Sequence, residues 1–264
     1  TITIRKFSEK PWSITDLINS GTMNVETAAW VWLCIQHELS MIIAGGTGSG
    51  KTSTLNAIAN FFPPNQRILS IEDTRELTLP NTLHWVPLET RMPNPEGKGE
   101  VSMLDLVINT LRMRPDRIIM GEIRRKAEAE VLFEAMHTGH SGYGTFHANN
   151  AEETIMRLIN PPIEVPRTVL SSLAAILVQN RNRRTGFRRT LQFAEIEANG
   201  DAKVIIQLDV AKDRLSQIGA PTRLLDTLGL YTGLTPEEIR NDLQNKMRIL
   251  NWLVAQKITD VHQI

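Results

Sequence analysis

The chain contains a short stretch in which three kinds of residue useful for phosphate chemistry lie together. Residues 44–54 read "AGGTGSGKTST", so four glycines precede one lysine and a run of hydroxyl side chains. Glycine permits backbone angles that other residues avoid, and successive N–H groups can therefore turn inward around phosphate oxygens. The lysine adds positive charge for the outer phosphates, and a hydroxyl can bind Mg²⁺. The stretch predicts a site for a nucleoside triphosphate with Mg²⁺.

The spacing matches the phosphate-binding-loop pattern G-x-x-x-x-G-K-[ST] over residues 45–52. This pattern requires a strand before it and a helix after it, and "MIIA" and "KTSTLNAIANFF" supply these elements. The start of that helix also directs a positive dipole toward an anion. The candidate ATP-binding residues are Gly45, Gly46, Thr47, Gly48, Ser49, Gly50, Lys51, Thr52 and Ser53, with Thr52 as the candidate Mg²⁺ ligand.

Two more predicted strands end in acidic residues. "RILSIEDTREL" places Glu72 and Asp73 after a short apolar run, and "RPDRIIMGEIR" places Glu122 after another. Open α/β sheets bind ligands beyond the carboxyl ends of their strands. A glutamate there can accept the proton of an attacking water, and Glu72 or Asp73 can support Mg²⁺ through water. Many ATPases of this kind carry an aspartate before the catalytic glutamate, but this chain has Gly121. The residue that supports the metal therefore stays open.

The elements that position these residues follow an alternating order. Apolar strands alternate with helices as far as "YGTFHA", which predicts a mostly parallel sheet with helices on both faces. Beyond Pro166 we expect a helix and then hairpin strands in "AAILVQ", "RRTLQFAEIE" and "AKVIIQLDV". A last helix is predicted to open at Thr235, because Pro236 suits a first turn and Glu238 completes a capping box.

The composition is that of an ordinary globular chain. Its 264 residues are 41% hydrophobic, and Lys+Arg and Asp+Glu both number 29, so bulk charge favours neither nucleic acid nor an acidic partner. The single cysteine, Cys34, excludes an intramolecular disulfide and is expected in the core. No apolar stretch approaches the roughly 20 residues of a membrane span. The chain begins "TITIRKF" without a methionine, so we expect it to be the C-terminal piece of a longer protein.

Four motifs, in this order and at these intervals, carry a resemblance. They are "GGTGSGKT", "RILSIEDTREL", "RMRPDRIIMGEIR" and "TGHSGYGTFHAN". Together they resemble the Walker A loop, Asp box, Walker B strand and His box of the secretion ATPase superfamily. Its members power type II secretion, type IV secretion, type IV pili and the archaellum. The segments after the Walker B glutamate look most like archaeal members, and the tetracysteine zinc module of bacterial type II members is missing.

The resemblance implies roles for individual residues and an α/β fold of the RecA-like P-loop ATPase type, with a C-terminal β-hairpin and helical extension. Glu122 matches the catalytic glutamate, and Glu72 matches a second important glutamate. The His box makes His147 the first choice for sensing the γ-phosphate, with His140 second. In the family, arginines before the ATPase domain reach a nucleotide held by the adjacent subunit, and Arg5 is the candidate here.

Two clusters allow more than one interpretation. His137, His140 and His147 invite a zinc site, but no cysteine or acid at ligand spacing joins them, so we favour phosphate sensing. The cluster "RNRRTGFRRT", residues 181–190, carries five arginines. We interpret it as a solvated hairpin tip, with an acidic face of a neighbour or of a membrane platform as the alternative.

The sequence-based hypothesis is an Mg²⁺-dependent ATPase motor. It assigns residues 1–12 to the end of an N-terminal domain and linker, and residues 13–264 to the ATPase domain, with a helical extension from about residue 220. The family implies a homo-oligomeric, hexameric ring that is cytoplasmic and acts at the inner face of the membrane through a platform protein. A nucleic-acid translocase, a regulatory ATP-binding module and a small-molecule kinase stay open as alternatives.

Overall fold

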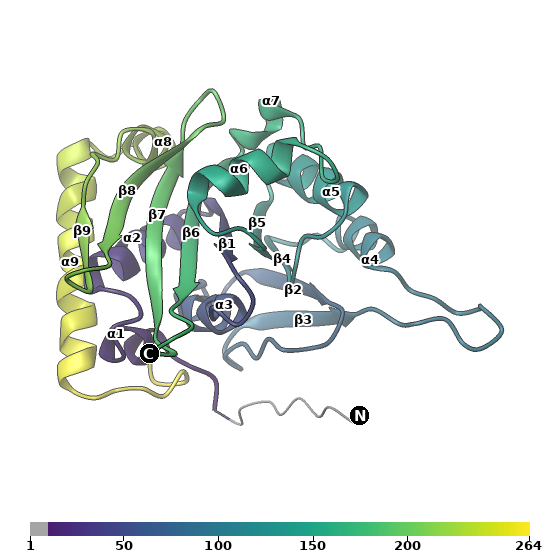
Figure 1. Ribbon diagram of the computed structural model, residues 1–264, viewed down its shortest axis with the longest axis horizontal. Helices are drawn as coiled ribbons and strands as arrows, with labels where there is room; N and C mark the ends of the chain where they lie inside the picture. Colours follow the sequence, from purple (N-terminus) through teal and green to yellow (C-terminus); the bar gives the residue numbers. More distant parts are fainter. Residues whose placement is uncertain (1–9) are drawn as a thin grey trace.

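The computed structural model describes residues 10–264, and its centre is one nine-stranded sheet. Strands β3, β2, β4, β5, β1 and β6 pair in parallel in this order, and β7, β8 and β9 continue the sheet antiparallel. The predicted mostly parallel α/β fold is therefore confirmed (Figure 1). Strands β1 to β9 span Ser40–Gly45, Arg67–Glu72, His84–Glu89, Arg117–Met120, Ser141–Phe146, Leu173–Arg181, Arg188–Ile196, Ala202–Asp209 and Arg214–Gln217.

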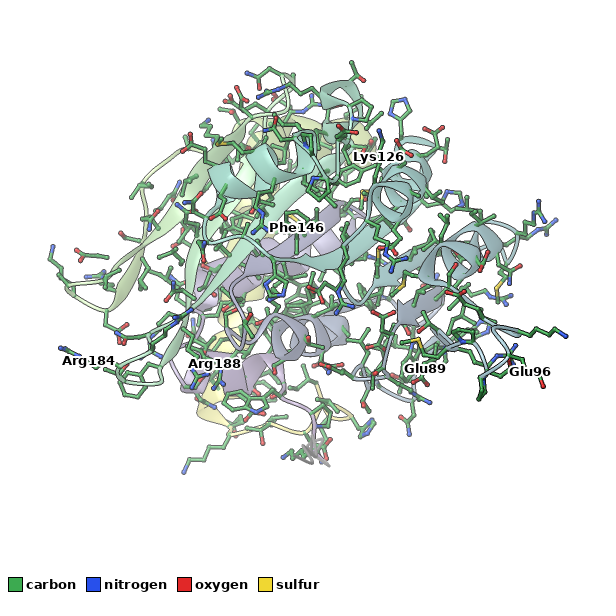
Figure 2. The ribbon with its side chains drawn as sticks, turned by 45° about the vertical axis from the view of Figure 1, so that its right-hand side comes forward. Glu89, Glu96, Lys126, Phe146, Arg184 and Arg188 are labelled. Atoms are coloured by element: carbon green, nitrogen blue, oxygen red, sulfur yellow. The ribbon has the colours of Figure 1, made fainter. Side chains whose placement is uncertain are left out.

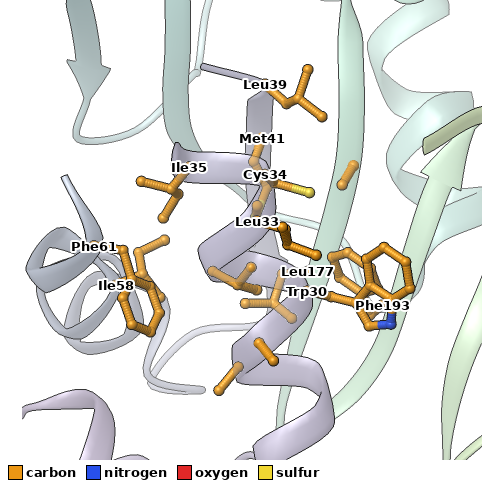
Figure 3. Packing of buried hydrophobic residues seen from close by; sticks show 14 of the residues in the cluster. Trp30, Leu33, Cys34, Ile35, Leu39, Met41, Ile58, Phe61, Leu177 and Phe193 are labelled. Carbon is orange, nitrogen blue, oxygen red and sulfur yellow. The ribbon is translucent and has the colours of Figure 1, made fainter. Parts of the chain in front are cut away.

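Helices lie on both faces of the sheet because its strands present apolar side chains to both sides. The six residues of β1 are all buried, with Met41 and Ile43 in one hydrophobic cluster and Ile42 and Ala44 in another. Figure 3 shows the first cluster around α2. Helices α1 to α9 span Ile14–Asn19, Val25–Gln36, Lys51–Ile58, Met103–Thr110, Lys126–His137, Ala151–Ile159, Arg167–Leu170, Arg223–Thr232 and Pro236–Ala255, and the 3-10 helix η1 spans Ala59–Phe61.

The helix starts follow the capping signals of the sequence. The Ser13 hydroxyl accepts from the Asp16 N–H at the start of α1, and Asn24 caps α2 in the same way. Thr235 caps α9, with Pro236 in its first turn as predicted. These caps satisfy N–H groups that have no partner inside the helix. Cys34 is fully buried on α2, and burial raises the pKa of its thiol to about 12.

The C-terminal strands belong to the central sheet. The predicted hairpin strands exist as β6, β7 and β8, but β6 also pairs in parallel with β1, with Ile43 opposite Leu177. The sheet thus continues through them without a break. The predicted helical extension from about residue 220 contains α8 and α9, whereas sequence patterns gave no prediction for α6 or β9. The domain boundary near residue 12 stays a prediction.

A buried arginine joins several elements at the amino ends of the strands. Arg117, the first residue of β4, has no exposed surface. Its Nη2 donates to the Ile35 carbonyl at the end of α2 at 2.6 Å, its Nη1 donates to the Tyr143 hydroxyl, and its Nε donates to Gln66 Oε1. The guanidinium also lies 4.9 Å from the centre of the Phe62 ring. Among residues 10–264 no carboxylate pairs with it, so neutral acceptors alone satisfy this charge.

Candidate active site

The glycine-rich stretch forms the turn between β1 and α3 at the carboxyl edge of the parallel strands. Gly50 adopts a φ of 97°, which favours glycine, and precedes the first residue of α3. No side chain caps this helix, so its first N–H groups face the loop. Lys51 Nζ donates to the Gly45 and Gly46 carbonyls at 2.9 and 3.0 Å. Burial lowers the pKa of Lys51, and the Glu122 carboxylate opposes that shift.

A cavity of about 860 Å³ opens beside this loop. Its walls bring together nearly all the predicted site residues, although they come from four separate strand ends. The walls include Thr47, Gly48, Ser49, Gly50, Lys51, Thr52, Ser53, Glu72, Asp73, Gly121, Glu122, Arg124 and His147. Gly45 and Gly46 lie directly before Thr47 at the end of β1. The structure therefore brings these residues together at one cavity, and their individual roles stay predictions.

Glu72, at the end of β2, is a buried carboxylate with half of its hydrogen-bonding capacity unused. It is 3% exposed, and its Oε1 accepts from the N–H groups of Glu76 at 2.9 Å and Leu77 at 3.1 Å. Its Oε2 is buried and has no hydrogen-bond partner among the described residues, and the same holds for Ser49 Oγ. Burial raises the pKa of Glu72. Buried polar atoms without partners are rare, so these two atoms indicate a place for a ligand.

Gly121, at the position where an aspartate precedes the glutamate in many P-loop ATPases, packs against Glu72. A Cβ atom at position 121 would lie 3.1 Å from Glu72 Cγ, which is tighter than ordinary packing. A side chain at position 121 would therefore require Glu72 to shift by a few tenths of an ångström. The carboxylate that lies at this point of the site belongs to the neighbouring strand β2.

Glu122 lies two residues beyond β4 and is contacted by two side chains. Its Oε1 lies 2.9 Å from His147 Nε2, and its Oε2 accepts from Arg124 Nε at 2.8 Å. His147 follows β5, the strand beside β4. Partial burial and the nearby Lys51 charge lower the pKa of His147, while Glu122 raises it. The lowered pKa favours the neutral imidazole beside the Glu122 carboxylate.

Arg124 is a site residue that sequence reasoning missed. Besides Glu122, it forms an ion pair with Asp73, whose other carboxylate oxygen accepts from the Thr90 hydroxyl at 3.3 Å. The bond to Glu122 raises the pKa of Arg124. Asp73 is therefore already neutralised, whereas Glu72 has an oxygen to spare, and this separates the two candidate metal-supporting acids. An arginine two residues after a strand-end glutamate was the signal available in the sequence.

Two predicted residues lie elsewhere. His140 precedes β5, whereas His147 follows it, so the six residues of the strand, about 20 Å of backbone, lie between the two positions. His140 contacts the Ala135 carbonyl through Nδ1 at 3.3 Å and lines another cavity. The prediction that His140 could sense a γ-phosphate is wrong, because His140 lies at the amino end of β5, whereas the glycine-rich loop lies at the carboxyl ends of the strands. Arg5 lies outside the described residues.

The arginine cluster is only partly a solvated hairpin tip. Arg188 Nε donates to the carbonyl of Gly48 in the glycine-rich loop at 2.9 Å. Figure 2 shows Arg184 extended away from the body of the molecule and Arg188 closer to it. Arg188 is exposed, as the hairpin interpretation predicts, but it also contacts the glycine-rich loop.

Residues 10–264 contain neither a membrane-spanning helix nor a clustered metal site. None of the described helices combines the length and apolarity needed to cross a membrane. No group of three or more His, Cys, Asp or Glu side chains in this part of the chain is arranged to hold a metal ion.

The fold and the cavity define an α/β protein of the RecA-like class, with a glycine-rich loop and acids at the carboxyl ends of adjacent parallel strands. A family model described as type II/IV secretion system protein matches residues 1–202. The chain belongs to this family, and the resemblance read from the four motifs is confirmed.

Individual relatives are similar over most of the chain. A protein of Methanocaldococcus jannaschii is 40% identical over the whole chain, which spans 49% of that protein. A putative conjugal transfer protein of Mycobacterium tuberculosis is 36% identical over 77% of the chain, which spans 60% of the relative. The chain thus corresponds to about half the length of the first of these proteins.

Solved structures of secretion ATPases are similar to this chain. The VirB11 ATPase of the Brucella suis type IV secretion system, in complex with sulphate, aligns with a TM-score of 0.55 at 25% identity, over 75% of this chain and 62% of that one. The Legionella pneumophila ATPase DotB aligns with a TM-score of 0.57 at 21% identity, over 92% and 59%. The second likeness concerns the fold alone.

Proposed function

We propose that this chain hydrolyses ATP and serves as the motor domain of a secretion, type IV pilus or archaellum machine. The observation that carries the proposal is the convergence of Lys51, Glu72, Glu122 and His147 on one cavity beside the glycine-rich loop. The sequence of the loop also matches the phosphate-binding pattern. Membership of the family and the likeness to a type IV secretion ATPase support the assignment.

In this mechanism the loop N–H groups and Lys51 bind the β- and γ-phosphates. Thr52 and the free oxygen of Glu72, the latter through water, would hold Mg²⁺, which neutralises charge on the phosphate oxygens. Glu122 accepts a proton as a water oxygen attacks the γ-phosphorus and the bond to ADP breaks. His147 and Arg124 hold the Glu122 carboxylate in place. This geometry favours Glu72 over Asp73 as the acid that supports the metal.

The assembly belongs to the same proposal. We infer a homo-oligomeric ring, hexameric as the family implies, in which Arg5 reaches the nucleotide of a neighbouring subunit. The ring would be cytoplasmic and would act on a membrane platform protein at the inner face of the membrane, without direct nucleic-acid contact. If catalysis is shared between subunits, the rate per chain rises with protein concentration, and Arg5→Ala abolishes that rise.

A nucleotide-binding measurement tests the central claim. Lys51→Ala removes the cation at the centre of the loop, so fluorescent ATP should bind at least tenfold more weakly. Undiminished affinity would contradict a triphosphate at this site. Hydrolysis assayed with and without DNA separates the motor from a nucleic-acid translocase, because only a translocase should be stimulated. ATP binding without turnover would instead indicate a regulatory module.

A further inference from the structure

Two arginines face each other across the β6–β7 pair beside the glycine-rich loop. Arg181, the last residue of β6, lies opposite Arg188, the first residue of β7. Like charges directly opposite each other on antiparallel strands destabilise the pairing. Among the described residues no carboxylate forms an ion pair with either of them, whereas the adjacent Arg189 pairs with Asp213 at 2.8 Å. The local structure therefore holds two positive charges that it does not neutralise.

Both arginine side chains lie beside glycines of the loop, and Arg188 forms a hydrogen bond to it. Arg188 Nε donates to the Gly48 carbonyl at 2.9 Å, and its other two nitrogens have no hydrogen bond among residues 10–264. A Cβ at Gly48 would lie 3.2 Å from Arg181 Nη1, and one at Gly50 would lie 3.3 Å from Arg188 Cδ. Arg188 also lines the same cavity as Lys51 and Glu122. Arg188 thus lies at the rim of the predicted phosphate site, and Arg181 lies beside Gly48 of the loop.

The order of strands separates these charges from the catalytic acids. In the sheet, β1 lies between β5 on one side and β6 on the other. Glu72, Glu122 and His147 follow β2, β4 and β5, on the first side, while Arg181 and Arg188 belong to β6 and β7, on the second. A phosphate chain lying across the loop would therefore direct its γ-phosphate toward the acids and its inner phosphates toward the arginines.

We propose that Arg181 and Arg188 form an anion clamp that binds the α- and β-phosphates of a nucleotide held by the same chain. Arginine suits this role because its planar group donates paired hydrogen bonds to phosphate and stays charged. The clamp rests on the proposed nucleotide function and adds to it, because it predicts that the two arginines contribute to the affinity for the product ADP as well as for ATP. It also differs from an arginine supplied by a neighbouring subunit, since Arg188 is hydrogen-bonded to the loop of its own chain and Arg181 lies opposite it on β6.

Substitution at the hairpin tests the clamp. Fluorescent ADP and ATP are titrated into wild type, Arg181→Gln, Arg188→Gln and the matched control Arg184→Gln, whose side chain is exposed and away from the loop. Each clamp variant should bind ADP and ATP more weakly than wild type, by a similar factor of about ten, because charge-assisted hydrogen bonds to phosphate are lost. Competition by adenosine, which has no phosphate, should not change, and Arg184→Gln should behave like wild type.

The outcomes distinguish the two proposals. If wild type binds neither ADP nor ATP, the proposed function fails. If wild type binds both and the clamp variants bind equally well, the clamp is wrong while the nucleotide function stands. Unchanged ADP affinity with weakened self-association would instead show that the arginines face acids of another copy, and this also overturns the clamp. Thermal unfolding checks that each variant folds, and Arg188→Lys, which keeps one charge but loses the paired donors, should bind at an intermediate strength.

Discussion

The two ends of the parallel strands bury charge in different ways. At the amino end, Arg117 is fully buried and each of its three donor groups has a neutral acceptor. At the carboxyl end, Glu72 is almost as buried, yet one of its oxygens has no partner among the described residues. Burial of a charge therefore does not by itself indicate function. An unsatisfied buried atom that faces a cavity is the more informative sign.

The largest expected effect concerns the carboxyl end and activity. Glu122→Gln removes the proton acceptor but keeps the shape of the side chain, so ATP hydrolysis should fall by about 10² to 10⁴ with little loss of nucleotide affinity. Steady-state phosphate release and a binding titration measure the two quantities. Glu89→Gln is the matched control, because Glu89 is an exposed acid at the end of the edge strand β3, opposite Glu72. A rate within a few-fold of wild type would remove Glu122 from the mechanism.

The next effect concerns the amino end and stability. Arg117→Met leaves the Ile35 carbonyl, the Tyr143 hydroxyl and Gln66 without their donor, so the free energy of unfolding should fall by about 3 kcal/mol. Denaturant unfolding measures this change, and Arg112→Met, at an exposed position near the end of α4, is the control. The hydrolysis rate per folded molecule should stay near that of wild type. A large loss of the hydrolysis rate at an unchanged free energy of unfolding would contradict the structural role assigned to Arg117.

The smallest effect links stability to pH. Because the pKa of Glu72 is raised in the folded state, the folded chain binds this proton more readily than the unfolded chain. The stability that this proton gives is present below pH 4.5 and is lost as pH rises through the folded pKa. Glu72→Gln should therefore be more stable than wild type by about 1 kcal/mol at pH 7, with the gap closing toward pH 4.5.

Glu72→Gln should at the same time hydrolyse ATP more slowly, since it loses the free carboxylate oxygen. Chemical denaturation at a series of pH values measures the stability gap. A variant less stable than wild type at pH 7 would show that Glu72 is a structural residue, as Arg117 is.

The sequence predicted the alternating elements well because local signals determine them. Caps at Ser13, Asn24 and Thr235, and short apolar runs before acids, placed strands and helices close to their observed bounds. The convergence of Glu72, Glu122 and His147 followed from parallel pairing, since such strands bring their carboxyl ends to one edge.

Contacts between distant segments could not be predicted in this way. The bond from Arg188 to Gly48 spans 140 positions, and the space shared by Glu72 and Gly121 depends on which strands are neighbours. The error at His140 has the same cause. A histidine before a strand and one after it look alike in the sequence, although they lie at opposite ends of that strand.

The close approach of Gly121 to Glu72 has a consequence for how such a chain can change over time. An aspartate at position 121 would require the Glu72 side chain to move by a few tenths of an ångström, so each residue affects the packing of the other. Substitutions at the two positions should therefore be non-additive in their effects. A chain that gains an acid at position 121 should tolerate it better once residue 72 is smaller.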